Sequence, residues 1–214
     1  MARIVAYEEG ALGTVKAVSE DGSLFLFKAC YLEPAYANAD LADEVITLPS
    51  GLPFDIPDEV LTLALQATLA EGRALSLLAR AEQFRSGLER KLLSRDCSRF
   101  ACEAALDKLE SEGLLSDERY AESWMRQRSR SRAEGPRSLS AALASRGVDR
   151  NAVKNALARS FEGEERRDER LALIASSASR LLSREPDRRA VRSALIELGW
   201  RSVDIDDALD SLEP

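Results

Sequence analysis

Apolar and polar residues after residue 57 alternate with the three- and four-residue spacing of amphipathic helices. Pro57, followed by Asp58 and Glu59, is typical of a first helical turn, and the apolar positions then run through Leu69. The pattern leaves open whether this helix continues across Gly72. A predominantly helical structure is therefore predicted for the part of the chain after residue 57.

The residues before position 57 follow a different pattern. Three short runs rich in Val, Ile, Leu and Phe, separated by Glu-Glu-Gly and Glu-Asp-Gly, predict strands at 3–7, 13–18 and 24–29. Residues 41–48 fit a further strand or a short helix. Residues 48–57 contain Pro49, Gly51, Pro53 and Pro57, which predicts a linker and a domain boundary.

One arrangement of six positions occurs three times in the helical part. The copies are Leu88, Leu92, Asp96, Cys97, Cys102 and Leu106; Leu139, Leu143, Gly147, Val148, Val153 and Leu157; and Val191, Leu195, Gly199, Trp200, Ile205 and Leu209. The third position of each copy tolerates the left-handed conformation that ends a helix, and an apolar residue follows it. Self-similarity at a fixed period predicts tandem structural units that bury their apolar faces against one another.

Three helices are predicted for each copy. Their ranges are 73–81, 85–95 and 98–112; 117–131, 136–146 and 149–160; and 164–183, 187–198 and 202–211. The predicted fold is mainly α, with three tandem three-helix repeats preceded by a small β-rich module. The predicted division is an acidic module at 1–56, a linker helix with repeat 1 at 57–115, a basic repeat 2 at 116–163 and repeat 3 at 164–214.

Charge is distributed unevenly over a chain whose net charge is −7. Residues 1–60 carry three basic and eleven acidic side chains, whereas residues 119–159 carry ten basic and three acidic ones. Within this basic region Arg126 and Arg130, and likewise Arg128 and Arg132, are four apart and repel each other on a helix unless an anion lies opposite. The candidate contacts to nucleic acid backbone or to an acidic protein surface are Arg119, Arg126, Arg128, Arg130, Arg132, Arg137, Arg146, Arg150 and Lys154. The alternative is a solvated surface.

Aromatic residues accompany these arginines. Tyr120 and Trp124 could stack on bases, although their helical spacing favours packing in the core. Trp200 occupies a core position of the third copy and is expected to be structural.

Composition argues against an enzyme. The chain has no histidine, and its three cysteines lack a C-x-x-C spacing, so histidine bases and common zinc ligand sets are excluded. Cys97 and Cys102 take core positions of the repeat. Phosphate-binding glycine loops and nucleophile elbows are also missing from the sequence. We therefore expect no catalytic residues, no metal and no cofactor. Without a signal segment or a long apolar run, a cytoplasmic protein with no membrane contact is expected.

Residues 73–214 resemble the RecX family, bacterial regulators of the RecA recombinase. The resemblance is carried by Glu-Gly-Leu-Leu-Ser-Asp-Glu-Arg-Tyr-Ala at 112–121, the Arg/Ser-rich helix after it, Gly135-Pro136-Arg137, and residues 143–147. It implies an elongated, curved array of helical repeats that lies in the groove of a RecA filament on DNA. It also implies inhibition of ATP hydrolysis and strand exchange without catalysis. DNA would be reached through the filament, and a monomer is expected.

Two other functions fit the residues. A helix pair with a tight turn imitates a helix-turn-helix, so the chain could bind duplex DNA without a recombinase. A helical scaffold that contacts no nucleic acid is the third possibility.

Overall fold

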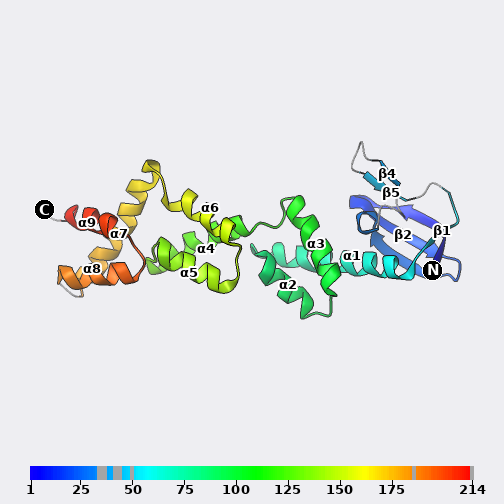
Figure 1. The fold of residues 1–214 in the computed structure, drawn as a ribbon, viewed down its shortest axis with the longest axis horizontal. Coiled ribbons are helices and arrows are strands. Elements are labelled where there is room, and N and C mark those ends of the chain that lie inside the picture. Colours follow the sequence, from blue (N-terminus) through cyan, green and yellow to red (C-terminus); the bar gives the residue numbers. More distant parts are fainter. Residues whose placement is uncertain (33–37, 41–44, 49–50, 185–186, 213–214) are drawn as a thin grey trace. The chain divides into compact units, whose positions relative to one another are not determined.

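The computed structural model describes residues 1–32, 38–40, 45–48, 51–184 and 187–212. A small sheet occupies the N-terminal part and helices make up the part that follows it (Figure 1), which confirms the predicted mainly α fold. The chain divides into two compact units: residues 1–81 with 88–115, and residues 82–87 with 116–214. This grouping does not test the predicted four-part division, which stays a prediction.

Four antiparallel strands form the N-terminal sheet. They are β1 (Ala2–Glu9), β2 (Thr14–Ser19), β3 (Leu24–Lys28) and β6 (Phe54–Ile56), in the order β3-β2-β1-β6. The strands predicted at 3–7, 13–18 and 24–29 are thus confirmed. Because successive side chains of a strand point to opposite faces, Ile4, Val15, Ala17 and Phe27 are buried on one face. Short 3₁₀ turns, η1 (Ala11–Gly13) and η2 (Ala29–Tyr31), follow β1 and β3.

The predicted linker is in part a strand. Strand β6 lies within 48–57 and pairs with β1, Ala2 opposite Ile56 and Ile4 opposite Phe54. Phe54 and Ile56 alternate with Asp55, and this period of two places Ile56 in the core. The segment 41–48, for which strand and helix were both open, contributes β5 (Val45–Thr47), which pairs with β4 (Asn38–Asp40). Residues 41–44 and 49–50 lie outside the described residues.

A single helix, α1 (Asp58–Leu78), runs across Gly72 without interruption. The helix predicted to start at residue 73 is therefore the last part of α1. Gly72 is exposed and costs only about 0.5–1 kcal/mol relative to Ala, whereas the buried stripe formed by Ala67, Ala70 and Ala74 continues past it. Ala67 packs into the core under the sheet, and Ala70 and Ala74 pack into the core of the first repeat.

A buried ionic cluster joins the sheet to α1. The Glu71 carboxylate, 2% exposed, lies 2.6 Å from Nζ of Lys28 and accepts a hydrogen bond of 3.0 Å from the Tyr31 hydroxyl. The hydroxyl of Thr68 accepts a bond from the backbone N–H of Lys28 at 2.8 Å. Removing one member of such a buried pair leaves an uncompensated charge, at a cost of about 3–5 kcal/mol. The sheet is thus fixed to α1.

The remaining helices follow the predicted repeat. They are α2 (Arg85–Leu93), α3 (Arg99–Ser111), α4 (Asp117–Arg132), α5 (Pro136–Arg146), α6 (Arg150–Phe161), α7 (Arg167–Leu182), α8 (Arg188–Glu197) and α9 (Ser202–Asp210), with the 3₁₀ turn η4 (Glu164–Arg166) before α7. The predicted helix ends adopt a left-handed backbone, with φ of 60° at Asp96, 87° at Gly147 and 92° at Gly199. None of the helices in the described ranges combines the length and hydropathy needed to cross a membrane.

The same helix end recurs in all three repeats. The residue after each left-handed position donates its backbone N–H to a carbonyl one turn earlier: Cys97 to Leu92 at 3.4 Å, Val148 to Leu143 at 3.3 Å, and Trp200 to Leu195 at 3.2 Å. This bond satisfies a carbonyl that the helix leaves unpaired. It also turns the following apolar side chain into the core, and Cys97, Val148 and Trp200 are all buried as predicted.

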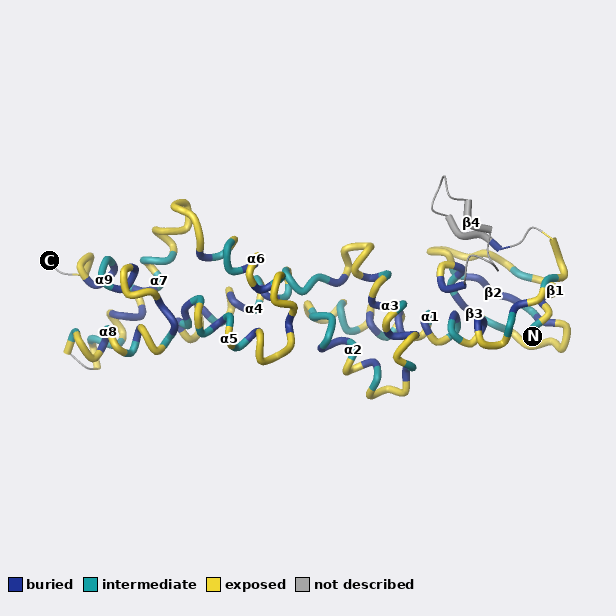
Figure 2. Tube along the Cα trace, in the orientation of Figure 1, coloured by how far each residue is buried: buried dark blue, intermediate teal, exposed yellow. Residues whose placement is uncertain are grey.

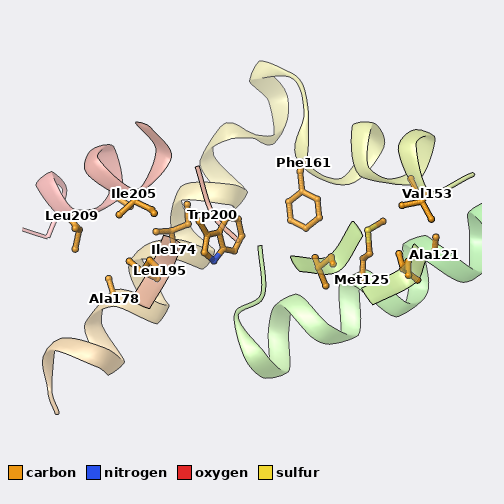
Figure 3. Close-up of a cluster of buried hydrophobic side chains, with 14 of the residues drawn as sticks. Ala121, Met125, Val153, Phe161, Ile174, Ala178, Leu195, Trp200, Ile205 and Leu209 are labelled. Atoms are coloured by element: carbon orange, nitrogen blue, oxygen red, sulfur yellow. The ribbon is translucent and has the colours of Figure 1, made fainter. Parts of the chain in front are cut away.

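Repeats two and three share one hydrophobic core (Figure 3). Met125 and Val153 come from the second repeat, and Ile174, Leu195 and Ile205 from the third. Figure 2 shows the buried positions recurring along these helices between exposed ones. The two repeats therefore do not have independent cores, as is expected of repeat proteins whose units bury surface against their neighbours.

Backbone hydrogen bonds fix the junction between these two repeats. Gly135 donates its N–H to the carbonyl of Leu198 at 2.7 Å, and Arg137 donates to that of Gly199 at 3.3 Å. The indole Nε1–H of Trp200 donates to the carbonyl of Ala133 at 2.8 Å. A Cβ added to Gly135 would lie 2.7 Å from the backbone of Gly199. Glycine is therefore required at position 135 by a close approach of two backbones.

A related contact joins the start of α2 to the second repeat. The hydroxyl of Ser86 donates to the carbonyl of Gly147 at 2.7 Å, and that of Ser138 donates to the carbonyl of Glu197 at 3.4 Å. Ser86 and Ser138 are separated by the same number of residues as Gly147 and Gly199. The second helix of one repeat thus begins against the helix end of the next repeat in both cases.

We expect Gly135→Ala to destabilise the second unit by about 1–3 kcal/mol, because overpacking against fixed backbone shifts the junction. Gly72→Ala is the matched control: its added Cβ meets nothing within 4 Å, so it should stabilise the first unit by about 0.4–1 kcal/mol. Urea unfolding followed by circular dichroism measures both changes. Equal stability of the two variants would contradict the close approach at Gly135.

A second prediction concerns Tyr31 at alkaline pH. Burial, together with the Glu71 carboxylate, raises the pKa of Tyr31 above its ordinary value of 10.0. The stabilisation from the neutral phenol is complete below pH 10.0 and is lost as the pH rises above it, because the unfolded chain then releases this proton first. We expect Tyr31→Phe to cost about 1 kcal/mol at neutral pH and to reduce the alkaline loss of stability.

Denaturant titrations of both proteins on either side of pH 10.0 give this comparison. Tyr7→Phe, in strand β1 and outside the cluster, serves as the control. An alkaline loss that is identical in wild type and Tyr31→Phe would refute the assignment.

Candidate nucleic-acid interface in the second repeat

Helix α4 begins at a capped and anchored N-terminus. The Ser116 hydroxyl accepts the backbone N–H of Arg119 at 3.2 Å, and acidic residues in the first turn favour the positive helix end. The Asp117 carboxylate also accepts the backbone N–H groups of Arg85 at 2.6 Å and Asp149 at 2.9 Å. One side chain thus ties the start of α4 to the starts of α2 and α6, which fixes the basic helix in place.

Helical spacing divides the arginines of α4 between faces. Ala121, Met125 and Ser129 are buried at four-residue intervals. Arg126 and Arg130, one residue further along, are exposed. Trp124, whose helical spacing favoured packing in the core, is half-buried, and so is Arg128.

Arg128 has an internal partner. Its guanidinium forms a two-pronged ion pair with Glu134, with Nε 2.9 Å and Nη2 2.6 Å from the two carboxylate oxygens. Such bidentate pairs are the strong ones among charge-assisted hydrogen bonds. Arg128 was predicted as a contact to an external anion, and this ion pair argues against that role. We therefore leave it out of the candidate contacts.

Both aromatic side chains contact other parts of the fold. The Tyr120 ring lies 4.7 Å from that of Phe84. The guanidinium groups of Arg128 and Arg146 lie 5.0 and 5.1 Å from the Trp124 ring centre, within cation–π range. These contacts fit packing within the fold, the alternative that the sequence also allowed. Base stacking on Tyr120 or Trp124 stays a prediction that the geometry does not support.

Arg119 and Arg146 are also engaged within the fold. Nε of Arg119 lies 3.1 Å from Oε1 of Glu82, in an exposed ion pair. The other predicted contact residues are exposed and form no ion pair with any residue in the described part of the chain: Arg126, Arg130, Arg132, Arg137, Arg150 and Lys154. Some charges of the predicted basic region are therefore available to an external anion, whereas those of Arg119, Arg128 and Arg146 are engaged within the fold.

A cleft of about 940 Å³ lies beside α4, lined also by residues of α6, η4 and α7. Of the predicted contact residues, it brings together Arg126 and Arg130. It adds Arg159 and Arg166, which the predicted set did not contain. Arg159 is the last residue of the basic region 119–159, so the charge pattern could have placed it among the candidate contacts. Arg166 lies outside this region, and only the packing of α7 brings it to the cleft.

Carboxylates accompany the arginines in this cleft. Nη1 of Arg159 lies 2.6 Å from Oε1 of Glu118 and 3.4 Å from Oε1 of Glu122, and Nη1 of Arg166 lies 3.0 Å from Oε2 of Glu169. Glu122 and Glu169 line the cleft themselves. In the described ranges no three His, Cys, Asp or Glu side chains are grouped as a metal site. The arrangement can bind an anion, and the carboxylates compete for it.

Comparisons with known proteins all lead to one family. Residues 116–157 match the family model described as RecX, second three-helix domain, which covers α4, α5 and most of α6. The regulatory protein RecX of Xanthomonas axonopodis pv. citri is 44% identical over 92 residues, which are 43% of this chain and 56% of that protein. The regulatory protein RecX of Pseudomonas fluorescens is 43% identical over 98 residues, 45% of this chain and 63% of that protein.

These matches span a little more than half the length of the curated relatives. A crystal structure of regulatory protein RecX covers 98% of this chain and 100% of its own, with a TM-score of 0.67 and 20% identity. That of RecX from Lactobacillus salivarius covers 69% and 96%, with a TM-score of 0.60 and 23% identity. The chain is thus similar to RecX regulatory proteins in sequence over the second repeat and its surroundings, and to RecX crystal structures in fold, and the predicted resemblance to the RecX family is confirmed.

Proposed function

We propose that this chain binds RecA recombinase filaments on DNA and mostly inhibits their ATP hydrolysis and strand exchange, without catalysis of its own. The observation that carries the proposal is the exposed arginine face of α4, which lies in the repeat that matches the second three-helix domain of RecX. The names of the relatives as regulatory proteins support the regulatory role. The proposal includes a cytoplasmic location and a monomeric chain.

The basic residues suit a contact with a filament on DNA. Arg126, Arg130 and Arg132 are exposed on one helix, and Asp117 holds the start of that helix against two neighbours. A fixed group of charges loses little conformational freedom when it binds, which favours affinity. Since the first 60 residues are acidic, the attraction to a polyanion is confined to the repeats.

Replacing Arg126, Arg130 and Arg132 with Ala should weaken binding to RecA filaments on single-stranded DNA by on the order of tenfold or more, because each lost cation costs counterion release. Recombinase ATP hydrolysis with increasing amounts of the variant measures the loss of inhibition. Circular dichroism should stay unchanged, since these side chains are exposed.

Arg184, Arg189 and Arg201 provide a charge-matched control in the third repeat, where all three are exposed. Their replacement with Ala should leave inhibition close to the wild-type level. Equal inhibition by wild type and the α4 variant would contradict the proposed contact. Binding of wild type to bare duplex as tightly as to the filament would favour the alternative, a DNA-binding module that needs no recombinase.

A further inference from the structure

The cleft between α4, α6 and α7 has the composition of an anion site. Arg126, Arg130, Arg159 and Arg166 line it, and Phe161 and Leu173 supply apolar surface. Ser129 and Ser160 are also among the lining residues. Arginine forks and hydroxyl groups are the side chains that most often contact phosphate oxygens.

Two of these arginines carry charges that the described residues do not compensate. Arg126 and Arg130 form no ion pair within those residues and lie one helical turn apart, a rise of about 6 Å along α4. Like charges at this spacing repel each other. A concave wall concentrates their field, so the cleft attracts an anion and the repulsion is relieved when one binds.

The other two arginines are held by exchangeable carboxylates. The Arg159 side chain is 69% exposed and pairs with Glu118 at 2.6 Å and, on the side of the cleft, with Glu122 at 3.4 Å, whereas that of Arg166 is 44% exposed and pairs with Glu169. Exposed ion pairs contribute about 0–1 kcal/mol, so a stronger anion can displace the carboxylates. Glu122 and Glu169 therefore act as competitors that the chain itself carries.

We propose that this cleft binds the phosphodiester backbone of single-stranded nucleic acid, with phosphates taking the places of Glu122 and Glu169 on Arg159 and Arg166. The inference rests on the proposed function and deepens it, since it names the ligand of one site within the basic repeat. Arg126 and Arg130 of α4 contact phosphates directly, Arg159 extends the contact to α6, and Arg166 extends it to the start of the third repeat.

The concave shape favours a single strand over a duplex. Duplex recognition places a protruding helix or ribbon in a groove about 12 Å wide, whereas a narrow flexible strand can enter a cleft of about 940 Å³. Nucleic acid is favoured over an acidic protein segment for a separate reason. A peptide carboxylate that displaced the carboxylate on Arg159 would only exchange one carboxylate for another, with little gain in free energy. A nucleic acid gains additional free energy, because it releases condensed counterions when it binds.

The test uses the full chain, a short fluorescent single-stranded oligonucleotide and no recombinase. Arg126→Ala with Arg130→Ala should lower affinity on the order of tenfold and reduce the slope of log K against log salt by about 1.4, at about 0.7 for each lost contact. Glu122→Gln with Glu169→Gln should raise affinity by on the order of threefold to tenfold, because each removes a competitor worth about 0–1 kcal/mol.

Arg184→Ala with Arg189→Ala is the matched control, since both arginines are exposed in the third repeat and neither lines the cleft. It should change affinity and salt slope less than the cleft pair does. Circular dichroism confirms that each variant is folded.

Several outcomes would overturn the inference. They are no binding of the oligonucleotide by wild type at low salt, equal losses for the cleft pair and the control pair, and unchanged affinity of the glutamine variant. A poly-glutamate peptide that binds in place of the oligonucleotide would assign the cleft to an acidic protein partner instead. None of these results depends on RecA, so failure of the cleft and failure of filament binding are distinguishable.

Discussion

The junction between the second and third repeats depends on one close approach between two backbones. Gly135 meets the helix end at Gly199, and no side chain fits between them. The backbone bonds from Gly135 and Arg137, and the indole bond of Trp200 to Ala133, are all formed across this contact. Because the shared core and the cleft both need α7 at a fixed distance from α4, they follow from the same constraint.

The charges of the second repeat serve more than one purpose. Arg128 closes the C-terminal end of α4 by pairing with Glu134, and Arg146 covers the Trp124 ring. The neighbouring Arg126 and Arg130 are held apart from these contacts by helical geometry alone. The net charge of the region does not show which arginines have partners within the fold and which are exposed. The fold separates these roles by giving some of the arginines internal partners and leaving others exposed.

Much of the fold could be predicted because the determining signals are local. The left-handed helix ends at Asp96, Gly147 and Gly199, and the apolar residue after each, are visible in the sequence as a repeating pattern. Continuity of α1 across Gly72 was left open because glycine weakens a helix. The helix continues because this glycine is exposed and costs little, and because the buried stripe continues on both sides of it. Strand β6 was missed because the prolines around it are typical of a linker.

The candidate site could be predicted only in part. Arg128 and Glu134 are six residues apart and meet because Ala133 takes a left-handed backbone, so the helical rule for neighbours does not reveal the pair. Arg166 reaches the cleft through the packing of α7, and the buried Glu71 meets Lys28 across 43 residues. Such contacts depend on tertiary structure. These positions are not part of the repeated pattern, so the sequence around them gives no local signal of the contact.

Helix α1 has a consequence for how this chain can be dissected. Its first half completes the core beneath the sheet and its second half completes the core of the first repeat, with Glu71 close to the division. A shortened chain that starts after the sheet would expose Val60, Leu61 and Ala64 to solvent. A chain that stops before α1 would expose the buried face of the sheet, because α1 covers it. The acidic module and the first repeat therefore depend on each other for folding. A deletion of either one would disrupt both, so the resulting loss of activity could not be assigned to one of them.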